Sequence, residues 1–263
     1  MNSRIPLPVL RALNWAGFLF MMVFTALAML LPLGGLTTQQ VSDQYPNLFT
    51  PAPFTFGIWG VIYGGQLLFL LFQSGLLGYR KGVDDALIAR LGLWPALLGV
   101  LNGLWLLAWH HLRPVTALLI IAAMLLSLIV LHRRTDAVAD ARARWLVRLP
   151  FRLYLGWISV ATIANATAVL VHLGFDGWGL PEEVWAALLV AVAAVLALAM
   201  LMRSGDFAFA AVVLWALLGI FVRHTAELGG QYQPVILATV LGMVVVLGAM
   251  AYTYFAGKRW GHD

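Results

Sequence analysis

The strongest constraint on the fold is a series of apolar stretches, each long enough to cross a lipid bilayer as a helix. A bilayer core requires about 17–25 apolar residues, and a helix satisfies its own backbone hydrogen bonds in lipid. The chain is 62% hydrophobic and only 10% charged, which leaves too little polar surface for a soluble domain. We therefore predict an all-α fold, a polytopic transmembrane helical bundle with about eight spans. The predicted spans cover residues 11–33, 54–76, 91–111, 115–132, 150–172, 184–202, 207–223 and 234–256.

Basic residues are distributed unevenly between the predicted loops. Lys and Arg are retained on the cytoplasmic side of a membrane protein. With the N-terminus inside, only Arg113 and Arg223 of the 16 basic residues fall in outer segments, and Arg152 lies at the inner mouth of the fifth span. We expect both termini in the cytoplasm and the bacterial inner membrane as the location. The net charge of +5 is explained by this inner collar facing anionic lipid headgroups, so the lipid bilayer is an expected partner and nucleic acid is not.

Two of the connecting segments are longer than the others. The outer segment from Gly34 to Pro53 is polar, rich in turn-forming residues and free of Lys and Arg, and we expect it to fold over an outward-facing cavity as a lid. The inner segment from Thr135 to Arg148 alternates Asp with Arg before Trp145, which is typical of a short helix lying at the membrane interface. A solvated connector is the alternative for this inner segment.

Polar and aromatic side chains recur at helical spacing inside three predicted spans. The positions are Trp157, Ala161 and Asn165 at steps of four, Asn102 three residues before Trp105, and Trp59 four residues before Tyr63. Such steps place side chains on one face of a helix. Because an unpaired amide in hydrocarbon costs a few kcal/mol, Asn in a span usually faces protein, and these faces are predicted to point inward. Core packing is the alternative role of the tryptophans, and close helix packing that of Ala161.

Three motifs follow one another along the second, third and fifth predicted spans. They read TPAPFTFGIWGVIY at residues 50–63, LNGLW at residues 101–105 and LYLGWISVATIAN at residues 153–165. In this order they resemble the signatures of the tryptophan-rich sensory protein and mitochondrial translocator protein family, also called the peripheral benzodiazepine receptor family. The resemblance covers residues 1–173, equivalent to the five-helix bundle of that family. We expect residues 174–263 to add three transmembrane helices, through which a second copy or another membrane protein can bind.

The resemblance implies a bundle whose interior binds flat hydrophobic molecules such as porphyrins and, in animal members, sterols and synthetic drugs. We therefore expect an integral membrane ligand-binding protein, a sensor or carrier, with porphyrin or haem as the ligand and no required cofactor. Aromatic faces suit a planar macrocycle, and a few amides and hydroxyls suffice to orient it. The expected ligand-binding residues are Phe56, Trp59, Tyr63, Asn102, Trp105, Trp157, Ala161 and Asn165.

The motifs depart from the family pattern at three places. Phe56 precedes Trp59 by three residues where compact members use four, Leu153 replaces a Pro, and Ala164 stands where Leu usually precedes the Asn. The predicted spans also set a depth for each residue. Trp157 is expected nearer the cytoplasmic side than Asn102 and Trp59, so a ligand that contacts the whole stripe would reach deep into the bundle.

A secondary transporter or a facilitator for a neutral or lipophilic solute is the alternative function. The predicted spans carry no Asp, Glu or Lys well inside their cores, which argues against ion-coupled transport because proton relays normally need such a residue. No enzyme is expected, since hydrolase, phosphate-loop and zinc-protease motifs are absent. Light-dependent breakdown of porphyrin, proposed for the family, is a lesser alternative.

Four histidines fall at the predicted outer ends of helices. They are His110, His111, His172 and His224. Imidazole can bind a metal or ligate haem iron, and this is an alternative role for the group. Their spacing lacks a tight ligand pair such as His-x3-His, and Cys is absent from the chain. No metal site is therefore predicted.

Overall fold

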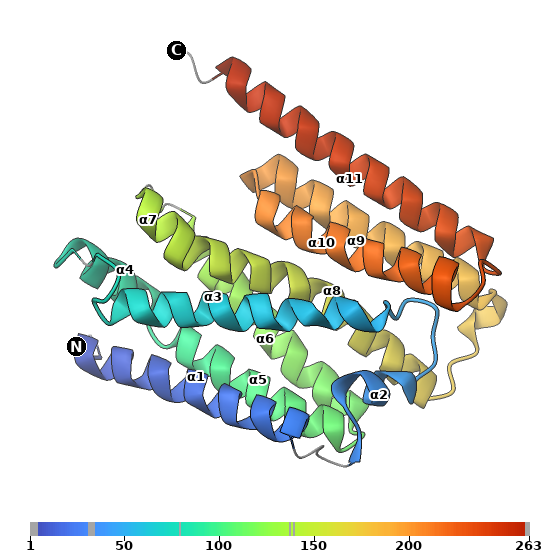
Figure 1. Cartoon of the computed structure of the whole chain (residues 1–263), viewed down its shortest axis with the longest axis horizontal. Helices are drawn as coiled ribbons and strands as arrows, with labels where there is room; N and C mark the ends of the chain where they lie inside the picture. The colour runs from blue at the N-terminus through green and yellow to red at the C-terminus, as the bar shows by residue number, and fades with distance from the viewer. Residues whose placement is uncertain (1–4, 31–34, 79, 137, 139, 261–263) are drawn as a thin grey trace. The chain divides into compact units, whose positions relative to one another are not determined.

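Helices make up the protein, and no strand occurs in the part of the chain that is described. The structure is a computed structural model, and it describes residues 5–30, 35–78, 80–136, 138 and 140–260, with side chains as far as residue 256. The helices are α1 (Leu7–Leu30), α2 (Thr38–Asp43), α3 (Ile58–Gln73), α4 (Val83–Leu91), α5 (Trp94–His110), α6 (Pro114–Thr135), α7 (Ala141–Ala143), α8 (Leu149–His172), α9 (Glu182–Ser204), α10 (Phe207–Val222) and α11 (Gln233–Trp260) (Figure 1). Short 3-10 turns cover Pro53–Gly57 and Gly177–Gly179, and π-helical turns cover Arg144–Arg148 and Arg223–Glu227.

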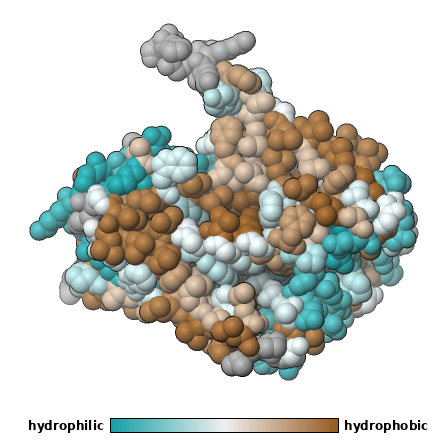
Figure 2. Space-filling view, viewed as in Figure 1, coloured by the Kyte–Doolittle hydropathy of each residue, from teal (hydrophilic) through white to brown (hydrophobic). Residues whose placement is uncertain are grey.

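The apolar helices confirm the predicted class of a polytopic helical bundle. Within the described residues, seven helical segments are long and apolar enough to cross a membrane, and α4 with α5, bent by 44° at their junction, would make an eighth. Large apolar side chains remain exposed along these helices, as with Leu119 at 68% and Met202 at 82%. Figure 2 shows broad hydrophobic patches on the face in view. A surface of this kind suits contact with lipid better than contact with water.

Two local predictions differ from the structure. The segment before α8 does not form a separate interfacial helix, because α7 and the π-helical turn Arg144–Arg148 run directly into α8. The loop between the second and third predicted spans contains α4, a helix that the apolar pattern did not indicate. Its start carries a recognisable signal: Asp85 accepts a hydrogen bond from the backbone N–H of Gly82 at 3.1 Å, as acidic residues in a first turn do.

The chain forms two compact units, which are described separately. The first consists of Met1–Val41 and Trp59–Ile158, and the second of Ser42–Ile58 and Ser159–Asp263. The domain boundary predicted at residue 173 is of another kind, because it separates the helices expected to match the family bundle from three added ones. That boundary stays a prediction.

Close contact between α1 and α5 organises the first unit. A Cβ on Gly99 would lie 2.4 Å from the backbone oxygen of Gly17, so only glycine permits this approach, as is common where membrane helices cross. Both ends of the Asn14 amide, on α1, are hydrogen-bonded. Its Nδ2 donates to Gln73 Oε1 at 2.9 Å, and its Oδ1 accepts from the N–H of Ala96 at 3.1 Å. Gln73 Nε2 donates to the backbone oxygen of Arg11 at 3.2 Å. This amide pair therefore joins α1, α3 and α5.

One end of the first unit is held by a buried ion pair. Arg142 donates from Nη2 to both carboxylate oxygens of Asp84, at 2.8 and 2.6 Å, and Asp84 is 1% exposed. The guanidinium also donates to the backbone oxygen of Leu77 at 2.8 Å and lies 4.9 Å from the centre of the Phe72 ring. The start of α1, α4 and α7 all lie at this end (Figure 1), where Arg11 pairs with Asp85 at 3.0 Å.

In the second unit, α9, α10 and α11 pack on one another, and α10 also holds the segment that precedes α3. The backbone N–H of Ala52 donates to the Gly219 oxygen at 3.0 Å, and Trp215 Nε1 donates to the Thr55 oxygen at 2.9 Å. The Phe54 ring meets the Trp215 ring edge-on at 5.2 Å. Part of the TPAPFTFG motif is thus packed against a C-terminal helix.

We predict that Arg142→Gln destabilises the protein by about 3–5 kcal/mol, because it leaves the buried Asp84 carboxylate without its cation. Arg144→Gln is the matched control, since Arg144 is exposed and such substitutions usually change stability by less than about 0.5 kcal/mol. Unfolding of both variants in mixed micelles measures the difference. Equal stability of the two variants would contradict the assigned role of the ion pair.

Candidate ligand-binding site

Trp59, in the first turn of α3, lies at the centre of an aromatic cluster in the first unit. Its ring stacks on Tyr63 with centroids 5.4 Å apart and an interplanar angle of 27°. It lies 5.7 Å from Trp105 of α5. Two rings of α8 meet it edge-on, Tyr154 at 6.0 Å and Trp157 at 6.1 Å. Offset and edge-on arrangements at these distances are favourable for aromatic pairs.

Helical periodicity explains why these rings meet. Trp59 and Tyr63 are one turn apart on α3, and Tyr154 and Trp157 are nearly one turn apart on α8, so each helix presents one aromatic face. Trp105, Tyr154 and Trp157 are buried, whereas Trp59 and Tyr63 keep intermediate exposure. The cluster therefore has a buried base and an accessible rim on α3.

Asn102 is buried at the base of this cluster. It is 0% exposed, and its Nδ2 donates to the Tyr154 hydroxyl at 2.5 Å. Its Oδ1 has no hydrogen-bond partner among the described residues. A buried polar atom without a partner costs about 1–3 kcal/mol. The site thus contains a hydrogen-bond acceptor that a bound molecule with an N–H or O–H group can satisfy.

A second amide group without a hydrogen-bond partner in the described chain belongs to Gln66 of α3. Gln66 is 6% exposed, and its Nε2 lacks a partner in the described chain. Gln66 and Tyr154 both line a cavity of ≈ 10 Å³ between α1, α3, α5 and α8, and roughly 10–15 Å³ is enough for one water molecule. This cavity is far too small for an organic ligand. It has room for one water molecule, which would hydrate the Gln66 amide.

The start of α2 lies against the end of α5 next to the cluster. Trp109 stacks on Trp105 with centroids 5.9 Å apart, and its Nε1 donates to the backbone oxygen of Thr38 at 3.3 Å. The Thr38 hydroxyl and His110 Nε2 form a further hydrogen bond of 3.1 Å. Thr38 belongs to the segment predicted as a lid. Gly34, where that segment was predicted to begin, lies outside the described residues.

The structure brings five of the eight predicted ligand-binding residues together and assigns three to the other unit. Trp59, Tyr63, Asn102, Trp105 and Trp157 form the cluster of the first unit. The other three, Phe56, Ala161 and Asn165, belong to the second unit. There Asn165 Nδ2 donates to the backbone oxygen of Ala161, one turn earlier on α8, at 2.9 Å. The aromatic rings and the buried amide of Asn102 thus belong to the same unit, the first.

Sequence reasoning missed Tyr154 as a member of the cluster. Tyr154 occupies the Tyr position of the quoted motif, and it is the side chain that ties Asn102 to α8. Trp157 was expected closer to the cytoplasmic side than Trp59. The two rings meet with centroids 6.1 Å apart, and their relative depth in the membrane stays a prediction.

The four histidines of the alternative metal or haem site each have another interaction. His111 Nδ1 bonds the Leu107 oxygen at 2.8 Å, and His224 Nε2 bonds the Leu48 oxygen at 2.8 Å. The His172 ring lies 6.1 Å from the Tyr45 ring, and His110 bonds Thr38. The described residues contain no group of three or more His, Asp or Glu side chains that could hold a metal ion.

The second unit contains a separate cavity of ≈ 310 Å³. Its walls include Phe49, Phe175 and Trp185, together with the carboxylates of Asp176 and Glu182. None of the eight predicted ligand-binding residues lines it. It offers a point of comparison for any measurement that locates a bound ligand.

Comparison with known proteins gives one match. The model of the TSPO-like protein family matches residues 11–252. The match extends well beyond residue 173, the limit of the resemblance carried by the sequence motifs, and takes in α9, α10 and most of α11. Comparisons with curated proteins and with solved structures give no match.

Proposed function

Because the chain belongs to the TSPO-like protein family, we propose that it binds a flat hydrophobic molecule at the aromatic cluster around Asn102. The protein is a multi-pass membrane protein by its apolar helices and its family. The proposed role is binding, as a sensor or carrier, without a resident cofactor. The bound molecule is proposed to be a tetrapyrrole such as porphyrin or haem.

One observation carries this proposal. The buried Oδ1 of Asn102 lacks a hydrogen-bond partner among the described residues, and its Nδ2 binds Tyr154, whose ring meets Trp59 in the cluster. In an apolar interior such an atom is costly, and small-molecule sites typically combine apolar walls with a few polar groups that fix orientation. A bound molecule with a donor group would remove the cost, and its face would pack on indole rings.

A free-base porphyrin meets both requirements. Its macrocycle is planar and wide enough to contact more than one ring, and free-base porphyrins carry N–H groups. Stacked or edge-on contacts between aromatic systems contribute about 0.5–1.5 kcal/mol per pair beyond the area they bury. The rings of Trp59 and Tyr63, which keep intermediate exposure, provide the side from which such a molecule can approach.

We predict that Trp157→Phe combined with Asn102→Ala weakens binding of protoporphyrin IX by about fivefold or more, since one hydrogen bond and one indole contact together contribute about 1–3 kcal/mol. Binding is measured from porphyrin emission with the protein in nanodiscs. Trp145→Phe is the matched control, because Trp145 is 69% exposed and lies outside the cluster.

The result is interpreted together with the melting temperature of each variant, so that loss of folding is recognised. A folded double variant with wild-type affinity would remove the cluster from the binding site. Equal loss in the Trp145→Phe control would show that porphyrin responds to indole content rather than to this site.

We also propose that both termini face the cytoplasm of a bacterial inner membrane. Basic residues lie at one end of the first unit, where several form ion pairs. Examples are Arg11 with Asp85 and Arg80 with Asp140 at 2.6 Å. The pKa of Asp140 lies below its usual range because the Ala143 backbone N–H donates to it and Arg80 lies beside it. A basic end of this kind is retained inside during insertion.

The absence of Cys from the chain makes this orientation easy to test. We predict that Arg113→Cys reacts with a membrane-impermeant maleimide in intact spheroplasts, whereas Lys81→Cys reacts only after permeabilisation. Both residues are basic and exposed, so the two variants control for each other. The reverse pattern would place the termini outside.

A further inference from the structure

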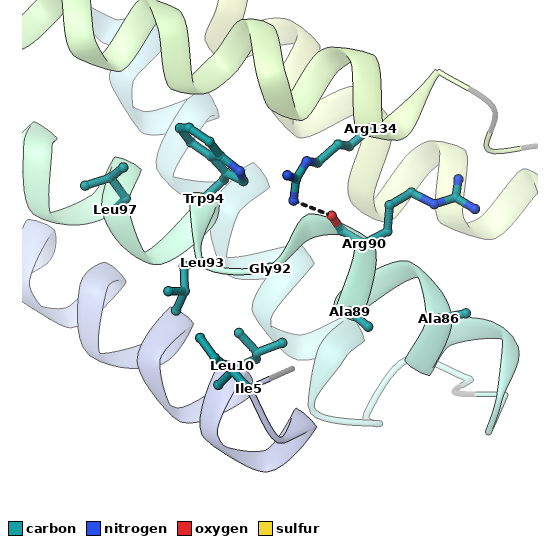
Figure 3. A pocket seen from close by; sticks show the side chains of 10 residues that line it. All are labelled: Ile5, Leu10, Ala86, Ala89, Arg90, Gly92, Leu93, Trp94, Leu97 and Arg134. Carbon is teal, nitrogen blue, oxygen red and sulfur yellow. Dashed lines mark hydrogen bonds between the residues drawn. The ribbon is translucent and has the colours of Figure 1, made fainter. Parts of the chain in front are cut away.

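We propose that a crevice at the basic end of the first unit binds the headgroup of an anionic phospholipid, with Arg90 and Arg134 as its cationic ligands (Figure 3). The crevice has a volume of ≈ 790 Å³ and lies between the start of α1, the junction of α4 with α5, and the end of α6. It is separate from the aromatic cluster, and the proposal does not depend on the proposed tetrapyrrole function.

The crevice exists because the chain breaks between α4 and α5. The two helices are bent by 44°, and Gly92 at the break adopts a φ of +63°, a conformation that glycine adopts far more readily than other residues. A Cβ at Gly92 would lie 3.3 Å from Nη1 of Arg134. The break therefore leaves room for the guanidinium to reach the end of α4.

Arg134 is held in place at the crevice wall. Its Nη1 donates to the backbone oxygens of Arg90, at 2.6 Å, and Leu91, at 3.2 Å. Its guanidinium carbon lies 5.8 Å from the centre of the Trp94 ring. Nη2 has no hydrogen-bond partner within the described part of the chain, so one edge of a positioned guanidinium is left to bind an anion. A positioned guanidinium suits phosphate oxygens.

Arg90 supplies a second cation. Its side chain is exposed and extends outward from the end of α4 in Figure 3. No carboxylate among the described residues pairs with it or with Arg134. Other arginines at this end do have carboxylate partners: Arg11 with Asp85, Arg80 with Asp140, Arg142 with Asp84, and Arg148 and Arg152 with Asp136. The crevice therefore carries uncompensated positive charge.

The remaining walls identify the anion as part of a lipid. Ile5, Leu93 and Leu97 line the crevice and are exposed at 37%, 42% and 42%, and Trp94 is a residue typical of the headgroup boundary. A free phosphate would gain nothing from these apolar walls, whereas the glycerol and acyl chains of a phospholipid would cover them. Basic pockets between transmembrane helices bind anionic headgroups in this way.

Native mass spectrometry of the full chain tests the proposal with phosphatidylglycerol and, for comparison, phosphatidylcholine of the same acyl chains. We expect phosphatidylglycerol to bind wild type more tightly than phosphatidylcholine. Each arginine near a membrane surface contributes about fivefold in affinity, so Arg90→Gln with Arg134→Gln should weaken phosphatidylglycerol binding by about 25-fold. The matched control is Arg133→Gln with Arg144→Gln, which removes the same charge from two exposed arginines outside the crevice.

Arg90→Gln alone keeps the result interpretable if loss of Arg134 disturbs folding. The exposed Arg90 side chain has no hydrogen bond or ion pair within the described chain, and we expect an unchanged melting temperature with about fivefold weaker phosphatidylglycerol binding. Wild-type affinity in this variant, equal loss in the control pair, or equal binding of phosphatidylcholine to wild type would each overturn the proposal.

Discussion

The structure of the first unit depends on how polar side chains are satisfied inside an apolar helical bundle. Hydrocarbon offers no hydrogen bonds, so an amide in a span stabilises the fold only when another protein group meets it. Asn14 and Gln73 fulfil this requirement and thereby join α1, α3 and α5. Asn102 fulfils half of it: its Nδ2 binds Tyr154, and its Oδ1 has no partner among the described residues. The first pair explains how the helices are held, and the second explains where a ligand would add stability.

The aromatic cluster and the basic end of this unit share one feature: each has a polar or charged group without a partner among the described residues, beside apolar side chains. At the cluster, rings from α3, α5 and α8 pack on one another, Tyr154 binds the Asn102 amide, and Trp59 and Tyr63 stay partly exposed. At the basic end, Asp84 is fully compensated by Arg142, whereas Arg90 and Arg134 are not compensated by any described carboxylate. In both places a group that folding leaves unsatisfied lies beside apolar walls. Such places are where binding is expected, because a ligand gains both kinds of contact.

The sequence allowed the spans and most of the cluster to be predicted, and the reasons for the failures are physical. Apolar length alone identifies membrane helices, because few alternatives exist in lipid. It does not indicate α4, whose pattern is mixed, or α7 and the π-helical turn Arg144–Arg148 that run directly into α8. Phe56 and Asn165 share motifs with cluster residues but belong to the second unit. The segment around Phe56 is held by distant contacts, such as that of Trp215 with Thr55, and no local spacing reveals these.

The central claim is that the cluster around Asn102 is a binding site for a planar hydrophobic molecule. The most direct measurement is an experimental structure of the full chain purified with protoporphyrin IX. The account predicts the macrocycle in contact with Trp59 or Trp157, with a donor group directed at Asn102 Oδ1. A macrocycle bound instead in the cavity lined by Phe49, Phe175 and Trp185, with the cluster unchanged, would contradict it.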